Sequence, residues 1–179
     1  MSATLKTFDL TFLGAMNEIK KKVLTLVYIR DEENILLGLK KRGFGQGKWN
    51  GFGGKVHPGE TILDGAIREV EEECGLILQP KDVIYTGIID FEFKNDPVHL
   101  EVHVFEARIY AGEVTESEEM KPKWFKISEM PYDQMWIDDE FWHPYFFKGQ
   151  KFKSYFLYEG FDTILTHQVT PVETLTLTN

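Results

Sequence analysis

The chain has 179 residues, 14% of them aromatic, a formal net charge of −9 at pH 7 and a single cysteine. This acidic balance argues against a general nucleic-acid-binding protein, because such proteins usually carry a basic face, and the lone cysteine excludes an intramolecular disulfide framework. No apolar run approaches the length of a membrane span, so we expect one domain with a substantial core, no membrane insertion and no stable nucleic-acid partner.

Residues 1–21 precede the first strong strand pattern and are interpreted as an N-terminal extension, in which Met16 is an alternative start. The segment contains Asp9 and Glu18 and no arginine, whereas mitochondrial transit peptides are rich in arginine and poor in acids. We therefore expect a cytoplasmic protein, with a mitochondrial or nuclear fraction as the alternative. A monomer is the default expectation, because the sequence shows no exposed apolar stripe.

The first predicted strands flank a short polar turn. Residues 22–30 are apolar and β-branched, which predicts a buried strand, and residues 35–40 predict the returning strand after a turn at residues 31–34. Residues 40–50 then form a basic, glycine-rich stretch. This stretch is either a flexible surface loop or a mouth that carries cations and an aromatic ring to a planar anionic ligand.

A helix is predicted within residues 54–76. Thr61 followed by Asp64 is typical of a helix N-terminus, and Gly75 suits the left-handed position after a helix. The helix has a core-facing side, formed by Ile62, Leu63, Ala66, Ile67, Val70 and Cys74. Residues 51–54 before it are rich in glycine, so their backbone can approach a ligand closely.

Three carboxylates share the other face of this helix. Glu69, Glu72 and Glu73 are spaced at i, i+3 and i+4, so their side chains lie within reach of one another. Like charges at this spacing destabilise a helix unless a cation offsets them, and an oxygen-only set of ligands favours Mg²⁺ or Mn²⁺. A solvated acidic helix face is the commoner explanation of such a run.

The remaining chain predicts more strands and one further helix. Strands are predicted at residues 83–93, 98–109, 124–127, 151–158 and 163–169, the last two as a hairpin, with an acidic loop at residues 112–121. In residues 98–109, Val102 and Val104 alternate with His103 and Phe105. A helix is predicted near Asp138 and Asp139, and residues 170–179 are interpreted as a polar C-terminal tail.

The helical stretch matches every fixed position of a known motif over 23 residues. In order, these positions are Gly54, Glu60, Arg68, Glu69, Glu72, Glu73 and Gly75. The chain thus resembles the Nudix family, whose members hydrolyse nucleoside diphosphates linked to another group and use a divalent metal. The resemblance implies the α/β Nudix fold, a mixed β-sheet sandwiched between helices (α/β/α), over residues 22–169.

The resemblance also implies roles for individual residues. The implied catalytic residues are Arg68, Glu69, Glu72 and Glu73. The implied ligands for Mg²⁺, with Mn²⁺ as an alternative, are Glu69, Glu72, Glu73, the distant Glu119 and the glycine pair Gly53 and Gly54. Arg68 would orient a neighbouring glutamate, and Gly53 would offer its backbone carbonyl.

Further segments resemble the animal MutT homologues within this family. These segments are residues 40–45, 49–55, 91–93, 102–105 and 136–139, with Ile137 standing where that pattern has proline. The resemblance implies hydrolysis of oxidised purine nucleoside triphosphates, such as 8-oxo-dGTP and 2-oxo-dATP, to the monophosphate and pyrophosphate. The alternatives are another nucleoside diphosphate-linked substrate or a non-catalytic Nudix module that binds a nucleotide.

The same resemblance implies a pocket for the purine and its phosphates. Its implied residues are Thr25, Lys40, Phe44, Asn50, Phe52, Gly53, Gly54, Lys55, Phe91, Phe93, Trp136, Ile137, Asp138 and Asp139. Adjacent carboxylates in a pocket need not both ionise. Our hypothesis is that Asp138 and Asp139 share a proton and so accept different oxidised purines, whereas helix capping is the structural alternative for one of them.

Overall fold

The computed structural model describes residues 20–177, so the interpretation of residues 1–19 lies outside the described part of the chain. Its strands and helices are β1 (Lys20–Arg30), β2 (Asn34–Lys40), β3 (Trp49–Asn50), α1 (Ile62–Cys74), β4 (Val83–Phe93), β5 (Val98–Ala107), β6 (Met120–Lys126), α2 (Asp139–Phe147), β7 (Phe152–Glu159) and β8 (Thr163–Pro171). Short 3₁₀ turns occur at η1 (Pro80–Asp82), η2 (Ile127–Glu129) and η3 (Tyr132–Gln134). Within residues 20–177, no helix is long and apolar enough to cross a membrane.

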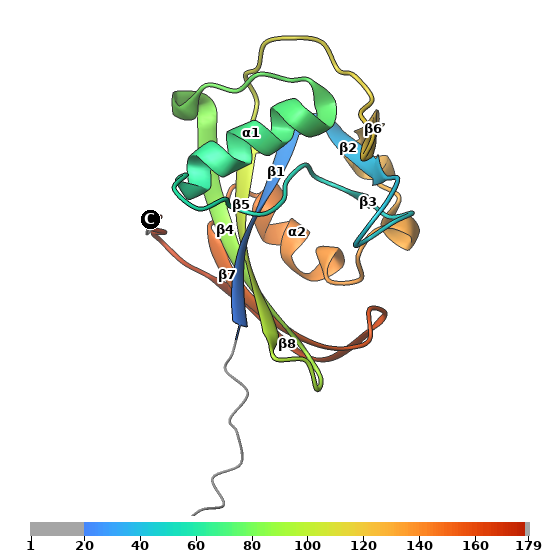
Figure 1. Cartoon of the computed structure of the whole chain (residues 1–179), viewed down its shortest axis with the longest axis vertical. Helices are drawn as coiled ribbons and strands as arrows, with labels where there is room; N and C mark the ends of the chain where they lie inside the picture. The colour runs from blue at the N-terminus through green and yellow to red at the C-terminus, as the bar shows by residue number, and fades with distance from the viewer. Residues whose placement is uncertain (1–19, 178–179) are drawn as a thin grey trace, which may run out of the picture.

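The strands form one mixed sheet (Figure 1). Its order is β3-β2-β1-β5-β4-β7-β8, and β6 pairs with β2 off this path. The β1–β5 and β4–β7 pairs are parallel, whereas the other named strand pairs are antiparallel. Each parallel pair needs a long connection between its strands. The connection between β4 and β7 contains α2, and the connection between β1 and β5 contains α1.

The two helices cover different hydrophobic cores. Val70 of α1 belongs to a core that includes Phe105 of β5, whereas Trp142 of α2 belongs to a second core that includes Val104. The alternation predicted for β5 is therefore confirmed, since neighbouring residues of this strand enter different cores. The arrangement of helix, sheet and helix is the α/β/α class that the family resemblance implied.

Local sequence explains the limits of α1. The Thr61 hydroxyl accepts a hydrogen bond from the Asp64 amide at 3.1 Å, which satisfies one free donor of the first turn. Gly75 has φ 76°, and its amide donates to the Glu71 carbonyl at 3.0 Å. Both predicted ends of this helix are confirmed.

Residues 51–56, the glycine loop, run along β1 and are bonded to it. The Val27 amide donates to the Phe52 carbonyl at 2.6 Å, and the Thr25 amide donates to the Gly54 carbonyl at 2.8 Å. In β1, only Ile29 and Arg30 pair with β2. The loop therefore pairs with the earlier part of the same edge of β1, which β2 leaves free. The loop is thereby held between β1 and α1.

Several predicted boundaries differ from the structure. Trp49–Asn50 forms the short strand β3 within the predicted loop, and β6 begins at Met120, inside the predicted acidic loop. Both segments pair with β2, so tertiary pairing overrides their weak local strand signal. The first strand begins at Lys20 and β8 extends to Pro171, so the predicted extension and tail each lose two residues to strands.

Adjacent glycines of the loop give a matched stability test. A Cβ on Gly53 would fall 2.0 Å from the Thr25 carbonyl oxygen, whereas a Cβ on Gly54 would meet the flexible carboxylate end of Glu69 at 2.6 Å. We expect Gly53→Ala to lower the free energy of unfolding by about 2 kcal/mol or more, because only backbone movement relieves its clash. Gly54→Ala should cost clearly less in denaturant unfolding. Equal losses in the two variants would contradict this account of the loop.

Candidate active site

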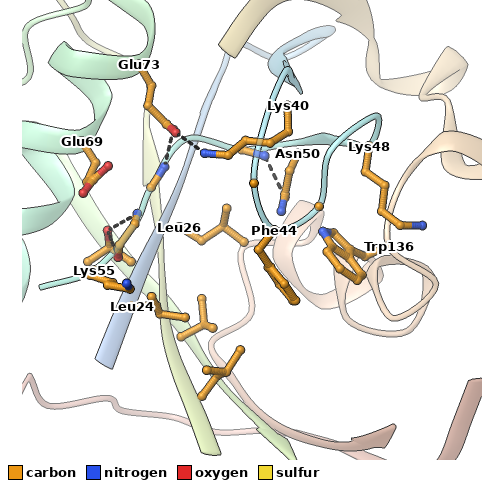
Figure 2. A pocket seen from close by; sticks show the side chains of 18 of the residues that line it. Leu24, Leu26, Lys40, Phe44, Lys48, Asn50, Lys55, Glu69, Glu73 and Trp136 are labelled. Carbon is orange, nitrogen blue, oxygen red and sulfur yellow. Dashed lines mark hydrogen bonds and ion pairs between the residues drawn. The ribbon is translucent and has the colours of Figure 1, made fainter. Parts of the chain in front are cut away.

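A cavity of about 920 Å³ joins the glycine loop, α1 and the start of α2. One end is acidic, because Glu69 and Glu73 face it from α1. The other end is aromatic, with Phe44 and Trp136 on its wall (Figure 2). Lys40 reaches from β2 toward the acidic end, as Figure 2 shows. A single cavity therefore connects a carboxylate cluster with flat aromatic surfaces.

Arg68 organises one part of the acidic end. One guanidinium nitrogen donates to Glu69 at 2.9 Å and to Glu72 at 3.0 Å. The other nitrogens donate to both carboxylate oxygens of Glu60, at 3.1 and 2.8 Å, and to the Lys55 carbonyl at 3.0 Å. The hydrogen bonds from Arg68 lower the pKa of Glu60 to about 2. These contacts place Arg68 where it can orient neighbouring carboxylates.

Lys40 organises the other part. Its ammonium donates to Glu73 Oε1 at 3.0 Å and to Glu119 Oε2 at 2.9 Å. Burial lowers the pKa of Lys40, but the hydrogen bonds and charges of Glu119 and Glu73 outweigh it and raise the pKa. The second oxygen of Glu73 accepts from the Gly53 amide at 2.9 Å. The structure thus brings the sequence-distant Glu119 to the acidic end, as predicted.

Glu73 is the most enclosed of these acids. Its side chain is 5% exposed, whereas that of Glu72 is 58% exposed. Burial raises the pKa of Glu73, although Lys40 and the Gly53 amide act in the opposite direction. A further cation near Glu73 would therefore favour its ionised form.

The donor set suits a hard divalent cation. Within residues 20–177, no three His, Cys, Asp or Glu side chains converge as a ready-made metal cluster. The four candidate ligands are instead divided between two cations. Arg68 pairs with Glu69 and Glu72, and Lys40 pairs with Glu73 and Glu119. All candidate ligands are oxygens, which matches Mg²⁺ or Mn²⁺ rather than a softer metal. The carbonyl of Gly54 accepts from the Thr25 amide at 2.8 Å, so Gly53 remains the better backbone candidate of the two.

Two buried aspartates lie at the aromatic end. Asp138 Oδ1 accepts from the Tyr158 hydroxyl at 2.6 Å, and its Oδ2 accepts from the Trp142 indole at 3.1 Å. Asp139 Oδ2 accepts from the Trp136 amide at 3.2 Å. The Asp138 side chain makes no capping hydrogen bond to the first turn of α2. Helix capping therefore does not explain this residue.

The aspartates differ in what stabilises their charge. Burial raises the pKa of Asp138, while the Tyr158 and Trp142 hydrogen bonds act against it. Burial and the neighbouring charge of Asp138 raise the pKa of Asp139 well above its usual value. Because adjacent buried carboxylates resist double ionisation, Asp139 is the member of the pair whose surroundings more strongly favour the protonated form.

Aromatic rings and a lysine surround the mouth at this end. Phe44 stacks on Trp136 with ring centroids 5.0 Å apart, and the Lys48 ammonium lies 5.1 Å from the centre of the Trp136 ring. Phe161, in the turn between β7 and β8, meets the Phe44 ring edge-on at 5.5 Å. The Phe44 side chain remains 58% exposed, so it presents an aromatic surface to an entering ligand.

Most predicted pocket residues line this cavity. They are Thr25, Lys40, Phe44, Asn50, Gly53, Gly54, Lys55, Phe91, Phe93, Trp136, Asp138 and Asp139. Phe52 and Ile137 do not, and these predictions are corrected. Phe52 is fully buried in the core beneath α1, because its extended loop turns successive residues to opposite sides, and Ile137 packs against the core on the α2 side.

Sequence reasoning missed several lining residues. Leu24 and Leu26 of β1 form part of the apolar floor, together with Ile89, Leu100 and Val102. Strand alternation places Leu24 and Leu26 on one face of β1, which was an available signal. The position of Lys48 in the basic loop was a weaker indication that it lines the cavity. Nothing in the sequence indicated the contact of Tyr158 with Asp138, because this contact depends on how β7 packs against α2.

Comparison with known proteins finds a matching family and similar curated proteins. The NUDIX domain family matches residues 20–146. The oxidized purine nucleoside triphosphate hydrolase of Danio rerio is 48% identical over 154 residues, which cover 86% of this chain and 97% of that protein. The protein of the same name from Mus musculus is 45% identical over 152 residues, covering 85% and 96%.

A solved structure supports the fold. The MutT protein from Bacillus halodurans superimposes with a TM-score of 0.73 over 83% of this chain and 97% of that one, at 24% sequence identity. Likeness at this identity speaks to the fold alone. The family match, the extent of the curated relatives and the glutamate-bearing helix together show that this chain belongs to the Nudix family.

Proposed function

We propose that this protein is a Mg²⁺-dependent hydrolase that converts oxidised purine nucleoside triphosphates to the monophosphate and pyrophosphate, and so removes them from the nucleotide pool. The observation that carries the proposal is the continuous cavity between the acidic end on α1 and the buried aspartates of the aromatic end. The names of the curated relatives from Danio rerio and Mus musculus support it. We further propose that it acts as a cytoplasmic monomer on free nucleotides rather than on nucleic acid.

The acidic end suits phosphoanhydride hydrolysis. Nudix hydrolases generally need a divalent metal, and a bound Mg²⁺ supplies charge neutralisation and an activated water. Glu69, Glu72, Glu73 and Glu119 would hold it, with the Gly53 carbonyl. The chain's own part is to position these carboxylates through Arg68 and Lys40 and to present cations to the phosphates.

Lys40 and Lys55 are the cations best placed for the phosphates. Both line the acidic end of the cavity, beside the glycine loop. The Lys40 ammonium is already bonded to two carboxylates, so its charge is largely balanced before a ligand enters. Lys55 lies on the loop itself, and its carbonyl is bonded to Arg68. The charge of Lys55 therefore favours a polyanionic group at this end, and Lys40 adds to it only as it leaves its carboxylate partners.

The aromatic end suits an oxidised purine. Trp136 and Phe44 offer flat surfaces on which a base can stack. A carboxyl pair that holds one proton offers one donor and one acceptor to the edge of the base. Movement of that proton between Asp138 and Asp139 would let the same pocket bind bases with different donor and acceptor patterns. Both side chains are buried beside the cavity, which supports this proposal.

The proposed activity predicts a specific substrate preference. Pyrophosphate release from 8-oxo-dGTP and 2-oxo-dATP should require Mg²⁺ and should be much faster than release from dGTP. Glu73→Gln should lower kcat/KM by on the order of a hundredfold or more. Mutating a residue that only hydrogen-bonds to a metal ligand already lowers activity about 10- to 100-fold, and the ligand itself should matter at least as much. The measurement is steady-state pyrophosphate release from the three nucleotides in parallel.

The control for folding is the thermal unfolding of Glu73→Gln, which should remain cooperative. Equal or absent hydrolysis of all three nucleotides by the unmodified protein would reject the proposed substrate class. Hydrolysis of the oxidised nucleotides that persists unchanged in Glu73→Gln would reject the assignment of the acidic end.

The aspartate pair predicts a pH-dependent effect on stability. A buried carboxyl with a raised pKa takes up a proton on folding, so its cost grows by about 1.4 kcal/mol per pH unit between the unfolded and folded pKa values. Asp139→Asn removes that cost, because an amide does not titrate. We expect the variant to gain thermal stability relative to the parent as the pH rises from 5 to 8. A difference that stays constant with pH would argue against a protonated Asp139.

Asp138→Asn tests the sharing of the proton. An amide at this position can no longer exchange a proton with Asp139, so one donor and acceptor pattern becomes fixed. The ratio of kcat/KM for 8-oxo-dGTP to that for 2-oxo-dATP should change by about tenfold or more, within the range expected for one polar contact to a base. Competition between the two nucleotides measures this ratio directly. An unchanged ratio would count against proton sharing.

A further inference from the structure

A hydrogen-bonded series of three polar side chains, two of them fully buried and one partly buried, lies behind the cavity wall and has no part in the chemistry described above. It consists of Tyr28 on β1, His143 on α2 and Tyr132 on η3. Tyr28 and His143 are both fully buried. None of the three lines the cavity, but Tyr28 bonds to Asn50, which does.

The carbonyl oxygen of Asn50 is fully occupied. Its Oδ1 accepts from the Tyr28 hydroxyl at 2.8 Å and from the Gly51 amide at 2.8 Å. A carbonyl oxygen has two lone pairs, so this atom has no further strong acceptor site. The amide nitrogen, Nδ2, is the atom that Asn50 can offer to a ligand, and it can only donate.

The number of hydrogens that each of these side chains carries determines the direction of the hydrogen bonds between them. The Tyr28 hydroxyl has one hydrogen, which it donates to Asn50, so it can only accept from His143 Nε2 at 3.4 Å. His143 must then carry its hydrogen on Nε2 and accept the Tyr132 hydroxyl on Nδ1, at 3.0 Å. Burial lowers the pKa of His143 to about 3, which keeps the ring neutral.

Packing explains why rings occupy these three positions, but it does not explain why the rings carry polar atoms. Tyr28 packs against His143, Trp142 and Phe146 with centroids 5.4, 5.7 and 5.3 Å away. Apolar rings would fill the same space without the cost of burying a hydroxyl and an imidazole. Asp139 also faces His143, but its Oδ1 lies 3.8 Å from Nε2, beyond hydrogen-bond distance. The polar atoms are thus directed toward Asn50.

We propose that Tyr28 is a positioning residue for base recognition, which holds Asn50 as an obligate hydrogen-bond donor, and that His143 and Tyr132 fix the direction of the Tyr28 hydroxyl. The pocket then selects a base edge that carries an acceptor, such as a carbonyl oxygen or an unprotonated ring nitrogen, opposite Asn50. This inference rests on the proposed function and adds a specificity determinant to the same site.

Tyr28→Phe tests the proposal by removing a single hydroxyl. We expect the KM for 8-oxo-dGTP to rise about tenfold while kcat changes less than twofold, because the hydroxyl acts at the base end and not at the phosphates. The expected size follows from the loss of one hydrogen bond. Adding Tyr28→Phe to Asn50→Ala should cause no further loss, since the residue that Tyr28 orients is already absent.

Tyr85→Phe is the matched control. The Tyr85 hydroxyl lies 2.8 Å from His103 Nδ1, another tyrosine–histidine pair in the same sheet, and neither residue lines the cavity. Removing it should lower thermal stability by an amount similar to Tyr28→Phe and leave KM unchanged. Equal KM values for the parent and Tyr28→Phe, or equal increases in both variants, would overturn the proposal.

A nuclear magnetic resonance measurement separates this inference from the proposed function. Long-range ¹H–¹⁵N correlation should show His143 protonated on Nε2, and Tyr28→Phe should shift the side-chain amide resonances of Asn50. If the protein hydrolyses none of the oxidised nucleotides, the proposed function fails, whereas these spectra still support or reject the orientation of Asn50. Protonation on Nδ1 would overturn the proposed direction of the hydrogen bonds.

Discussion

The backbone hydrogen bonds between β1 and the glycine loop are the constraint on which the rest of the site depends. They hold the loop so close to the strand that a side chain at Gly53 would overlap the Thr25 carbonyl. From that position, the Gly53 amide donates to Glu73, and Asn50, the residue of β3 just before the loop, accepts a hydrogen bond from Tyr28. One short run of backbone pairing therefore sets the distance between the acidic and the aromatic ends.

The acidic end is stable because its charges are paired before any ligand arrives. Arg68 joins Glu69 to Glu72 and Lys40 joins Glu73 to Glu119, so each cation balances carboxylates that would otherwise repel one another. The two groups differ in burial, since Glu72 is exposed and Glu73 is enclosed. The same helix face thus offers both a solvated and a desolvated carboxylate to one ligand.

Features that depend on residues close together in the sequence were predictable, whereas features that depend on contacts between distant residues were not. The limits of α1 were predictable because Thr61, Asp64 and Gly75 act within a few residues of one another. Glu119 was placed only through family resemblance, and Phe52 was misplaced because residue type alone does not show which way a loop turns. The bond between Tyr28 and His143 joins residues 115 positions apart, so it depends on how α2 packs and has no local signal.

The hairpin of β7 and β8 has a consequence for how the protein is made. Tyr158 of β7 completes the polar surroundings of Asp138, and Phe161 in the hairpin turn contacts Phe44 at the mouth. These residues leave the ribosome long after α1, whose glutamates are by then already synthesised. The glutamates of α1 therefore exist in the nascent chain before Tyr158 and Phe161, and the aromatic end of the cavity is completed only when the final hairpin docks against β4.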